Sequence, residues 1–173
     1  GKGFLQTKEI SKLIHEYLIS NDVMNSVKSK NKYSSRYNNN NDCFIHIRLG
    51  DVSKYTPGFS YYDNILSKLD VDNIYITSDS MYHDIVKKLL NKYSNAQLRY
   101  TNDLTDTFHF GSTCKHVILS YGTFSAVLGY LSFHSHVYCL RYCKKYAWDW
   151  RDNGQFQMFT DKYSSVGPWE VCG

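Results

Sequence analysis

The sequence of 173 residues lacks the features that mark several protein classes. It has only two prolines, and no apolar run approaches the roughly 18 residues that a membrane-spanning helix needs. Its net charge of +4 comes from interspersed acidic and basic residues rather than from the concentrated basic stripe of a duplex-binding domain. We therefore expect no signal peptide, no membrane span and no nucleic acid partner.

Cysteines are few and follow no metal-binding pattern. There are five, an odd number, and none forms a CxxC pair. Cys139 and Cys143 lie four residues apart, but no His or Cys follows at a zinc-like spacing. The asparagine-rich chain also has no N-x-[ST] acceptor site. Reduced thiols and a cytoplasmic location are therefore expected.

Familiar catalytic and metal signatures are also missing. The sequence has no GxGxxG, Walker A or Ser-His-Asp pattern, which disfavours dehydrogenases, NTPases and hydrolases. Asp70 and Asp72 form a DxD pair, but they precede a predicted strand and read as a solvated turn. His134 and His136 form an HxH pair with no evident third ligand. We expect no metal and no cofactor.

What the sequence does contain is a regular alternation of strands and helices. Apolar spacing predicts a helix over residues 7–20 and a polar, mobile loop over 21–42. From residue 43 to the end we expect one α/β domain. Its predicted strands are 43–49, 73–77, 97–100, 116–120 and 136–140, and its predicted helices are 60–69, 80–92, 104–113 and 124–133. Such alternation predicts a doubly wound, mostly parallel sheet with helices on both faces.

The stretch CFIHIRLGD at residues 43–51 places ionisable side chains within an apolar strand. With a period of two, Phe44, His46 and Arg48 share one face of that strand. Ligands of parallel sheets bind at the carboxyl ends of the strands, and arginine suits bidentate phosphate binding. Arg48 could equally form a buried Arg–Asp pair, and the pattern does not decide between the two roles.

Two later strand ends carry small polar residues. Ser78 and Ser80 flank Asp79, and either serine could cap the following helix. Residues 120–125 form a hydroxyl-rich turn at a helix start, which could bind an anion or could simply be capped by Thr123. In a doubly wound sheet this turn and Arg48 would face one crevice, an arrangement suited to a nucleotide diphosphate.

Four blocks of the sequence resemble one family in the same order. HIRLGD at 46–51 resembles the HxRRGD signature of glycosyltransferase family 11, the α-1,2-fucosyltransferases, and of the wider GDP-fucose transferase superfamily. ITSDS at 76–80, CKHVILSYGTFSAVLGYLS at 114–132 and GPWEV at 167–171 resemble further blocks of that family.

The resemblance implies a Rossmann-like domain, the donor-binding half of a GT-B glycosyltransferase. It implies transfer of L-fucose from GDP-fucose to a glycan hydroxyl, with inversion and without metal. Arg48 would hold the β-phosphate, and Asp51 is a candidate general base or else fixes the turn after the first strand. The substrate-binding residues so predicted are His46, Arg48, Ser78, Asp79, Asp106, Gly122, Thr123, Phe124 and Ser125.

The chain differs from the family in several respects, among them Ala126-Val127 in place of its Trp pair and Tyr121-Gly122 in place of its Asn-Ser. Leu49 stands where the family has a second arginine. The family also carries an acceptor-binding half, whereas only about forty residues precede the first predicted strand, too few for a second domain of typical size. One expectation is therefore a piece of a longer multidomain enzyme. A minimal relative of the family is the other. For the function, the alternatives to a transferase are a GDP-sugar-binding module that lacks transferase activity by itself and a structural or interaction domain with a vestigial site and no affinity for GDP.

Overall fold

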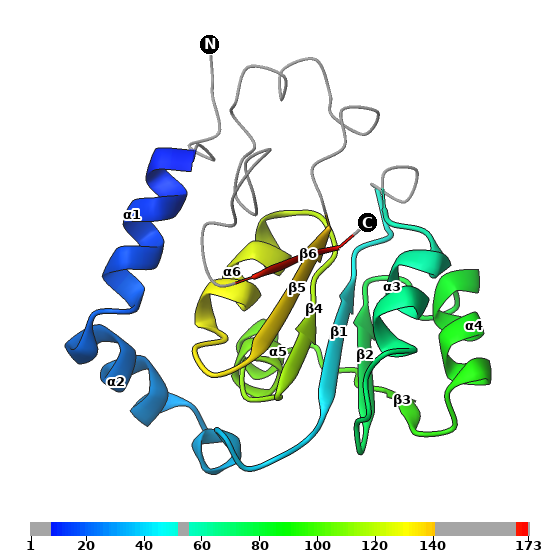
Figure 1. Ribbon diagram of the computed structural model, residues 1–173, viewed down its shortest axis with the longest axis horizontal. Coiled ribbons are helices and arrows are strands. Elements are labelled where there is room, and N and C mark those ends of the chain that lie inside the picture. The colour runs from blue at the N-terminus through cyan, green and yellow to red at the C-terminus, as the bar shows by residue number, and fades with distance from the viewer. Residues whose placement is uncertain (1–7, 52–55, 141–168, 173) are drawn as a thin grey trace.

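The computed structural model describes residues 8–51, 56–140 and 169–172. These residues form six strands, six α-helices and one 3-10 turn, and Figure 1 labels the strands and the α-helices. In chain order they are α1 (Lys8–Leu18), α2 (Asn21–Lys30), η1 (Ser34–Arg36), β1 (Cys43–Ile47), α3 (Phe59–Leu66), β2 (Ile74–Ser78), α4 (Asp84–Lys92), β3 (Ala96–Leu98), α5 (Leu104–Gly111), β4 (His116–Ile118), α6 (Thr123–Leu131), β5 (His136–Leu140) and β6 (Glu170–Cys172).

The strands form one sheet in the order β3-β2-β1-β4-β5-β6, and every neighbouring pair is parallel. The predicted doubly wound α/β sheet is therefore confirmed. From β3 at one edge, the chain returns through α5 to β4, which lies beside the central β1. The strand order thus reverses between β1 and β4, which is where sheets of this kind bind ligands.

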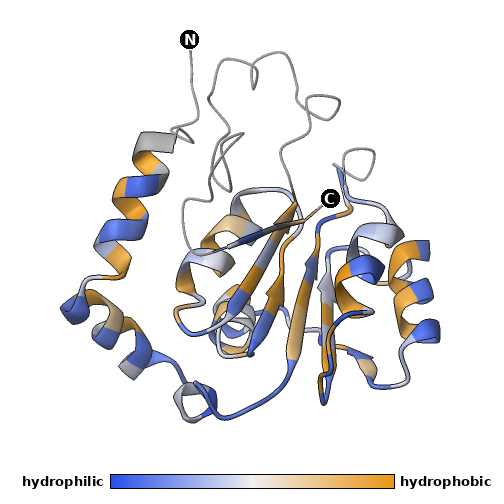
Figure 2. Ribbon diagram, viewed as in Figure 1, coloured by the Kyte–Doolittle hydropathy of each residue, from blue (hydrophilic) through white to orange (hydrophobic). Residues whose placement is uncertain are grey.

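Helices cover both faces of the sheet and enclose two cores. Helices α3 and α4 pack with Ile45, Ile47 and Leu49 on one face, and α5 and α6 pack with Phe44 on the other. Figure 1 shows these two helix pairs on opposite sides of the strands, and Figure 2 shows apolar residues along the strands between them. The predicted alternation along β1 is confirmed, and His46 and Arg48 belong to the face of α5 and α6.

Strand β6 was not predicted, because three residues are too few to show a period. It extends the sheet beside β5, with Tyr138 paired to Glu170 in register. The preceding Trp169 is buried, and its ring lies 5.1 Å from that of Tyr130. A Cβ on Gly129 would lie 2.7 Å from a Trp169 ring atom, so the glycine at this position of α6 makes room for the indole.

The prediction of a mobile loop over 21–42 is wrong. Helix α2 and turn η1 occupy much of this segment, and the buried Asn31 fixes the junction between them. Its amide donates to the carbonyl of His109 at 2.9 Å, and its Oδ1 accepts the Tyr33 N–H at 2.8 Å. Helix α2 itself buries no residue, and the rest of the segment is held by these hydrogen bonds and by the packing of Tyr33 against Phe110. Hydrophobic periodicity therefore gave no sign of it.

Helix α1 confirms the predicted N-terminal helix and contacts α6. Its apolar stripe is largely uncovered: Leu13 is 64% exposed and Tyr17 66% exposed, and the alternating colours of α1 in Figure 2 show the stripe. Among the residues that the structure describes, none of the helices has the length and apolarity needed to cross a membrane.

Candidate functional site

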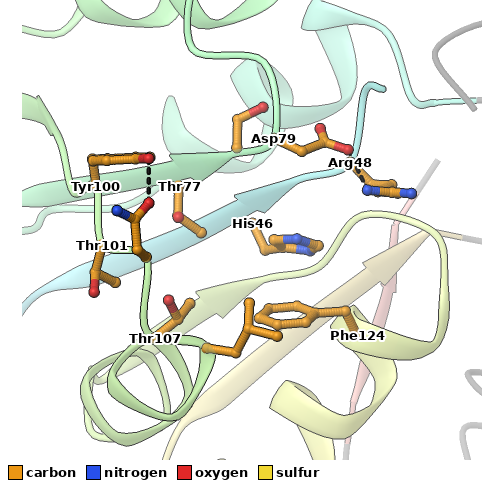
Figure 3. A pocket seen from close by; sticks show the side chains of 11 residues that line it. His46, Arg48, Thr77, Asp79, Tyr100, Thr101, Thr107 and Phe124 are labelled. Carbon is orange, nitrogen blue, oxygen red and sulfur yellow. Dashed lines mark hydrogen bonds and ion pairs between the residues drawn. The ribbon is translucent and has the colours of Figure 1, made fainter. Parts of the chain in front are cut away.

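A cavity of about 330 Å³ opens at the carboxyl edge of β1, β2 and β3. This volume lies at the lower end of the range for small-molecule sites. Figure 3 shows His46 in the middle of the site, with Arg48 and Asp79 on one side and Tyr100 and Thr101 on the other. The lining residues are His46, Arg48, Thr77, Ser78, Asp79, Tyr100, Thr101, Asn102, Leu104, Thr107 and Phe124.

Arg48 lies just beyond β1, and its guanidinium is held by two carboxylates. Nη1 donates to Asp79, and Nη2 donates to Asp51 at 2.6 Å. The Arg48 side chain is 38% exposed and lines the cavity. Of the two roles left open by the sequence, the structure shows the Arg–Asp pair, but this pair is open to solvent rather than buried. An open pair contributes little to stability and leaves the guanidinium accessible to a ligand.

Asp79 fixes both Arg48 and the turn that follows β1. Its Oδ1 accepts the backbone N–H groups of Leu49 at 2.7 Å and of Gly50 at 3.2 Å, while its Oδ2 accepts from Arg48. A Cβ on Gly50 would lie 2.7 Å from Asp79 Oδ2, so this glycine is needed for the close approach of the carboxylate. The turn and the cationic side chain are thus held by one residue of the loop that follows the neighbouring strand β2.

Asp51 lies outside the set of residues that line the cavity. Its side chain is 75% exposed and is paired with Arg48. It accordingly sits at the outer edge of the site, beside the guanidinium.

The prediction that Ser78 or Ser80 caps the helix after β2 is wrong. Neither Ser78 nor Ser80 caps the next helix, which begins at Asp84 and is capped by His83, whose Nδ1 accepts the Ile85 N–H at 3.2 Å. Ser78 instead lines the cavity, and its Oγ accepts the Ser80 N–H. Because the helix starts several residues later than predicted, a loop connects β2 to α4, and Asp79 from this loop reaches across to β1.

His46 is 7% exposed and is bound by Ser125, with a hydrogen bond between Nδ1 and Oγ. Its ring lies 4.7 Å from that of Phe124, which in turn stacks on Phe108 at 4.3 Å. Burial lowers the pKa of His46 to about 4, while the charge of Asp79 opposes this shift and that of Arg48 reinforces it. The imidazole is therefore neutral near pH 7.

The predicted anion-binding turn at 120–125 contributes one residue to the cavity, Phe124. Gly122 is the N-cap of α6 and has a φ of 105°, a conformation that favours glycine. Thr123 is the first residue of the helix, so it is not its N-cap. Ser125 is fully buried, and its Oγ also accepts the Ser120 N–H at 3.2 Å. The serine thus contacts His46 rather than the cavity.

Asp106 lies outside the cavity lining, although its neighbour Thr107 belongs to it. Its carboxylate accepts from Tyr33 Oη at 2.7 Å and from Arg99 Nη2 at 2.7 Å, and pairs with Lys32 Nζ at 2.5 Å. Burial raises the pKa of Asp106, but the hydrogen bonds of Lys32 and Tyr33 outweigh this and bring the pKa below its ordinary value. The structure thus places Asp106 in an internal charge cluster.

Residues after β3 were missed by the sequence reading. Tyr100, Thr101 and Asn102 all line the cavity, and Tyr100 is 61% exposed. The signal was available, because Tyr100 ends the predicted strand 97–100 and Thr101 and Asn102 follow it, so all three belong to the carboxyl edge. These residues lie outside the four blocks that resemble the family.

The aspartate and histidine pairs lie away from this site. Asp70 and Asp72 precede β2, at the opposite edge of the sheet, and their carbonyls accept the side chains of Asn41 and Asn95. His136 is paired with Glu170 at 2.7 Å. Within the described ranges, no group of three or more His, Cys, Asp or Glu residues could hold a metal ion.

Comparison with known proteins found no relative of this chain. No protein-family model, curated protein or solved structure matches this chain. Inferences about function therefore depend on the site and on the sequence blocks alone.

Proposed function

We propose that this chain is a glycosyltransferase domain that takes a GDP-sugar, GDP-fucose in particular, and transfers the sugar to a glycan hydroxyl with inversion and without metal. The observation that carries the proposal is the Arg48 guanidinium, held by Asp79 at the carboxyl edge of the sheet and open to a cavity of ligand size. The four sequence blocks that resemble glycosyltransferase family 11 support the choice of donor.

The guanidinium would bind the β-phosphate of the donor. Arginine has five N–H donors, of which the contacts to Asp51 and Asp79 occupy one each. The phosphate would displace Asp51 from the guanidinium rather than Asp79. Asp51 is far more exposed, whereas Asp79 is also hydrogen-bonded to the turn after β1. Arg48 would then stabilise the negative charge that grows on GDP as the bond to the sugar breaks.

Asp51, once displaced, is the carboxylate that we assign as candidate base. In an inverting transfer the acceptor oxygen attacks the anomeric carbon from the side opposite GDP, and its proton passes to a base. We further propose a reducing compartment such as the cytoplasm, since Cys43, Cys114 and Cys139 are buried free thiols.

A thermal-shift panel of GDP, UDP, ADP and their sugars tests the donor. A ligand that binds the folded chain raises its melting temperature by mass action, so GDP and GDP-fucose should give the largest shifts. A response to UDP but not to GDP would overturn the choice of donor.

A GDP-sugar-binding module without transferase activity is the second candidate. It is favoured by the place of the candidate base, since Asp51 is not among the residues that line the cavity. GDP binding without hydrolysis or transfer from GDP-fucose would select this candidate, whereas release of GDP in the presence of glycan acceptors would select the enzyme.

A further inference from the structure

Ser125 does not line the candidate site but contacts His46, which does. It is fully buried in the first turn of α6, so its hydroxyl does not reach a ligand in the cavity. It is nevertheless hydrogen-bonded to Nδ1 of His46, which does line the cavity. Any influence of Ser125 on a ligand must therefore pass through the imidazole.

The protons of this contact can be counted. A serine hydroxyl has one proton and two acceptor lone pairs. Oγ of Ser125 already accepts the backbone N–H of Ser120 at 3.2 Å, so its own proton is available for Nδ1 of His46. The reverse arrangement would give Oγ two donors and would require a further acceptor for the hydroxyl proton. The hydroxyl is therefore the donor, and Nδ1 accepts.

We propose that Ser125 is a positioning residue that holds His46 in the Nε2–H tautomer, so that the imidazole offers a neutral N–H donor to the ligand. Two contacts fix the ring: the Ser125 hydroxyl at Nδ1 and the Phe124 ring at 4.7 Å. With Nδ1 occupied by the serine proton, the single proton of a neutral imidazole resides on Nε2.

The tautomer matters because of the ligand chemistry. This step rests on the proposed function, in which the cavity receives a nucleotide rich in acceptor oxygens. An N–H at Nε2 attracts such an oxygen, whereas a lone pair at the same position would repel it. The two charged groups that affect the pKa of His46 are Arg48 and Asp79. They are hydrogen-bonded to each other, and Asp79 also holds the turn after β1. Neither group therefore supplies the neutral N–H donor that His46 offers.

The tautomer can be measured directly in the ligand-free protein. Two-bond ¹H–¹⁵N correlation spectra of the ¹⁵N-labelled chain distinguish a protonated ring nitrogen from one that bears a lone pair. At pH 7 we expect Nε2 of His46 to be protonated and Nδ1 to bear the lone pair. A proton found on Nδ1 would overturn the proposal, and this measurement requires neither a ligand nor a variant.

Ser125→Ala tests the role of the hydroxyl, with Ser132→Ala as the matched control. Ser132 is also a buried serine at α6, but its hydroxyl donates to the Leu128 carbonyl at 2.7 Å. In Ser125→Ala we expect a mixture of His46 tautomers and GDP affinity that is about fivefold weaker, as is usual for the loss of one orienting hydrogen bond. In Ser132→Ala both should match the wild type.

The two readouts separate the inference from the function on which it rests. An unchanged tautomer in Ser125→Ala would overturn the positioning role. A changed tautomer with unchanged GDP affinity would overturn the role of His46 as a donor to the ligand. If the wild-type chain did not bind GDP, the proposed function would fail, while the spectra would still decide whether Ser125 sets the tautomer.

Discussion

Two arginine–aspartate clusters lie on the same face of the sheet and differ in almost every physical respect. In the open cluster, Arg48 at the cavity edge is 38% exposed and is shared between Asp79 and the outward-facing Asp51. In the closed cluster, Arg99 is 22% exposed and Asp106 is 10% exposed. Similar residue types thus occupy an accessible site in one place and an internal junction in the other.

The closed cluster fastens the N-terminal segment to the domain. Arg99 donates to both Asp106 and Tyr33, and its guanidinium lies 3.8 Å from the centre of the Phe110 ring. Arg36 lies over the same ring at 4.4 Å and is paired with Asp42 at 2.6 Å. Aromatic rings and neighbouring acceptor oxygens therefore contact these guanidinium groups, and a ligand would have to displace packed side chains to reach them.

The difference shows that an Arg–Asp pair is functionally informative only when its exposure is known. The open cluster keeps unused N–H donors beside a cavity, so it is suited to bind an anion. In the closed cluster, Arg99 donates to Asp106 and Tyr33 and lies over the Phe110 ring, while among the described residues its Nε is buried without a hydrogen-bond partner. Substitutions in the first should therefore change ligand binding with little effect on stability, and substitutions in the second should do the opposite.

The largest expected effect is that of Arg48→Ala on activity. Transfer from GDP-fucose should fall by about a hundredfold or more, as when one group that stabilises a leaving charge is removed. The free energy of unfolding should change by less than about 1 kcal/mol, because the pair is exposed and Asp79 keeps its backbone donors. Initial-rate assays and urea denaturation measure the two effects, and normal activity in this variant would contradict the site assignment.

Arg99→Ala should show the reverse pattern. Removing this guanidinium leaves Asp106 with fewer partners and uncovers the Phe110 ring, so we expect a loss of about 2 kcal/mol in the free energy of unfolding. The thermal shift produced by GDP should remain as in the wild type. A variant of normal stability that no longer responds to GDP would mean that the closed cluster belongs to the ligand site after all.

Much of the fold was predictable, because apolar alternation is a strong signal wherever a strand is long enough. Five of the strands, the helices between them and the assignment of His46 and Arg48 to one face of β1 follow from it. What could not be predicted, α2 and β6, depends on other forces. The first is held by the side-chain hydrogen bonds of Asn31, and the second is a short strand that needs β5 as its template.

The site was predictable in position but not in detail. Strand ends predicted where ligand groups gather, yet local sequence does not tell which way a carboxylate turns. Asp79 turned toward β1, whereas Asp106 turned into the closed cluster. Leu49 illustrates the same point: it stands where the resembling family has an arginine, and it is buried among α3 and α4 on the face opposite Arg48. An additional cation at that position would not face this cavity.

His46 gives the open region a pH dependence that differs from that of an ordinary ion pair. Burial lowers the pKa of His46 in the folded state to about 4, against an unfolded value near 6.5. The unfolded chain therefore binds more protons between these values, so stability falls as the pH falls through this window. From pH 6.5 to 5 we expect a loss of about 1.5 kcal/mol from this residue, measured by urea denaturation.

His46→Gln should remove this contribution, so its free energy of unfolding should vary less between pH 6.5 and 5 than that of the wild type. His83→Gln is a useful control, because His83 caps α4 away from the cavity. Equal pH dependence in the wild type and His46→Gln would show that the imidazole is not buried as a neutral group.

The smallest expected effect, and the finest test of the open cluster, is that of Gly50→Ala. The added Cβ would lie 2.7 Å from Oδ2 of Asp79, which accepts from Arg48, so the carboxylate must shift from its present position. The contact that anchors the guanidinium would be disturbed, while its charge would remain. We expect a loss of about 1 kcal/mol in stability and a severalfold weaker affinity for GDP, measured by denaturation and by calorimetric titration.

Gly58→Ala is the matched control, because a Cβ at Gly58 has no heavy atom within 4 Å. Gly58 is the N-cap of α3, and glycine is more favourable than alanine at this position. A small loss of stability is therefore expected in Gly58→Ala as well. Affinity for GDP should nevertheless remain unchanged in this control. If Gly50→Ala bound GDP as tightly as Gly58→Ala, then the anchoring of Arg48 by Asp79 would be irrelevant to the ligand. The open cluster would in that case bind anions through the charge of Arg48 alone, since a guanidinium freed from Asp79 can still attract a phosphate.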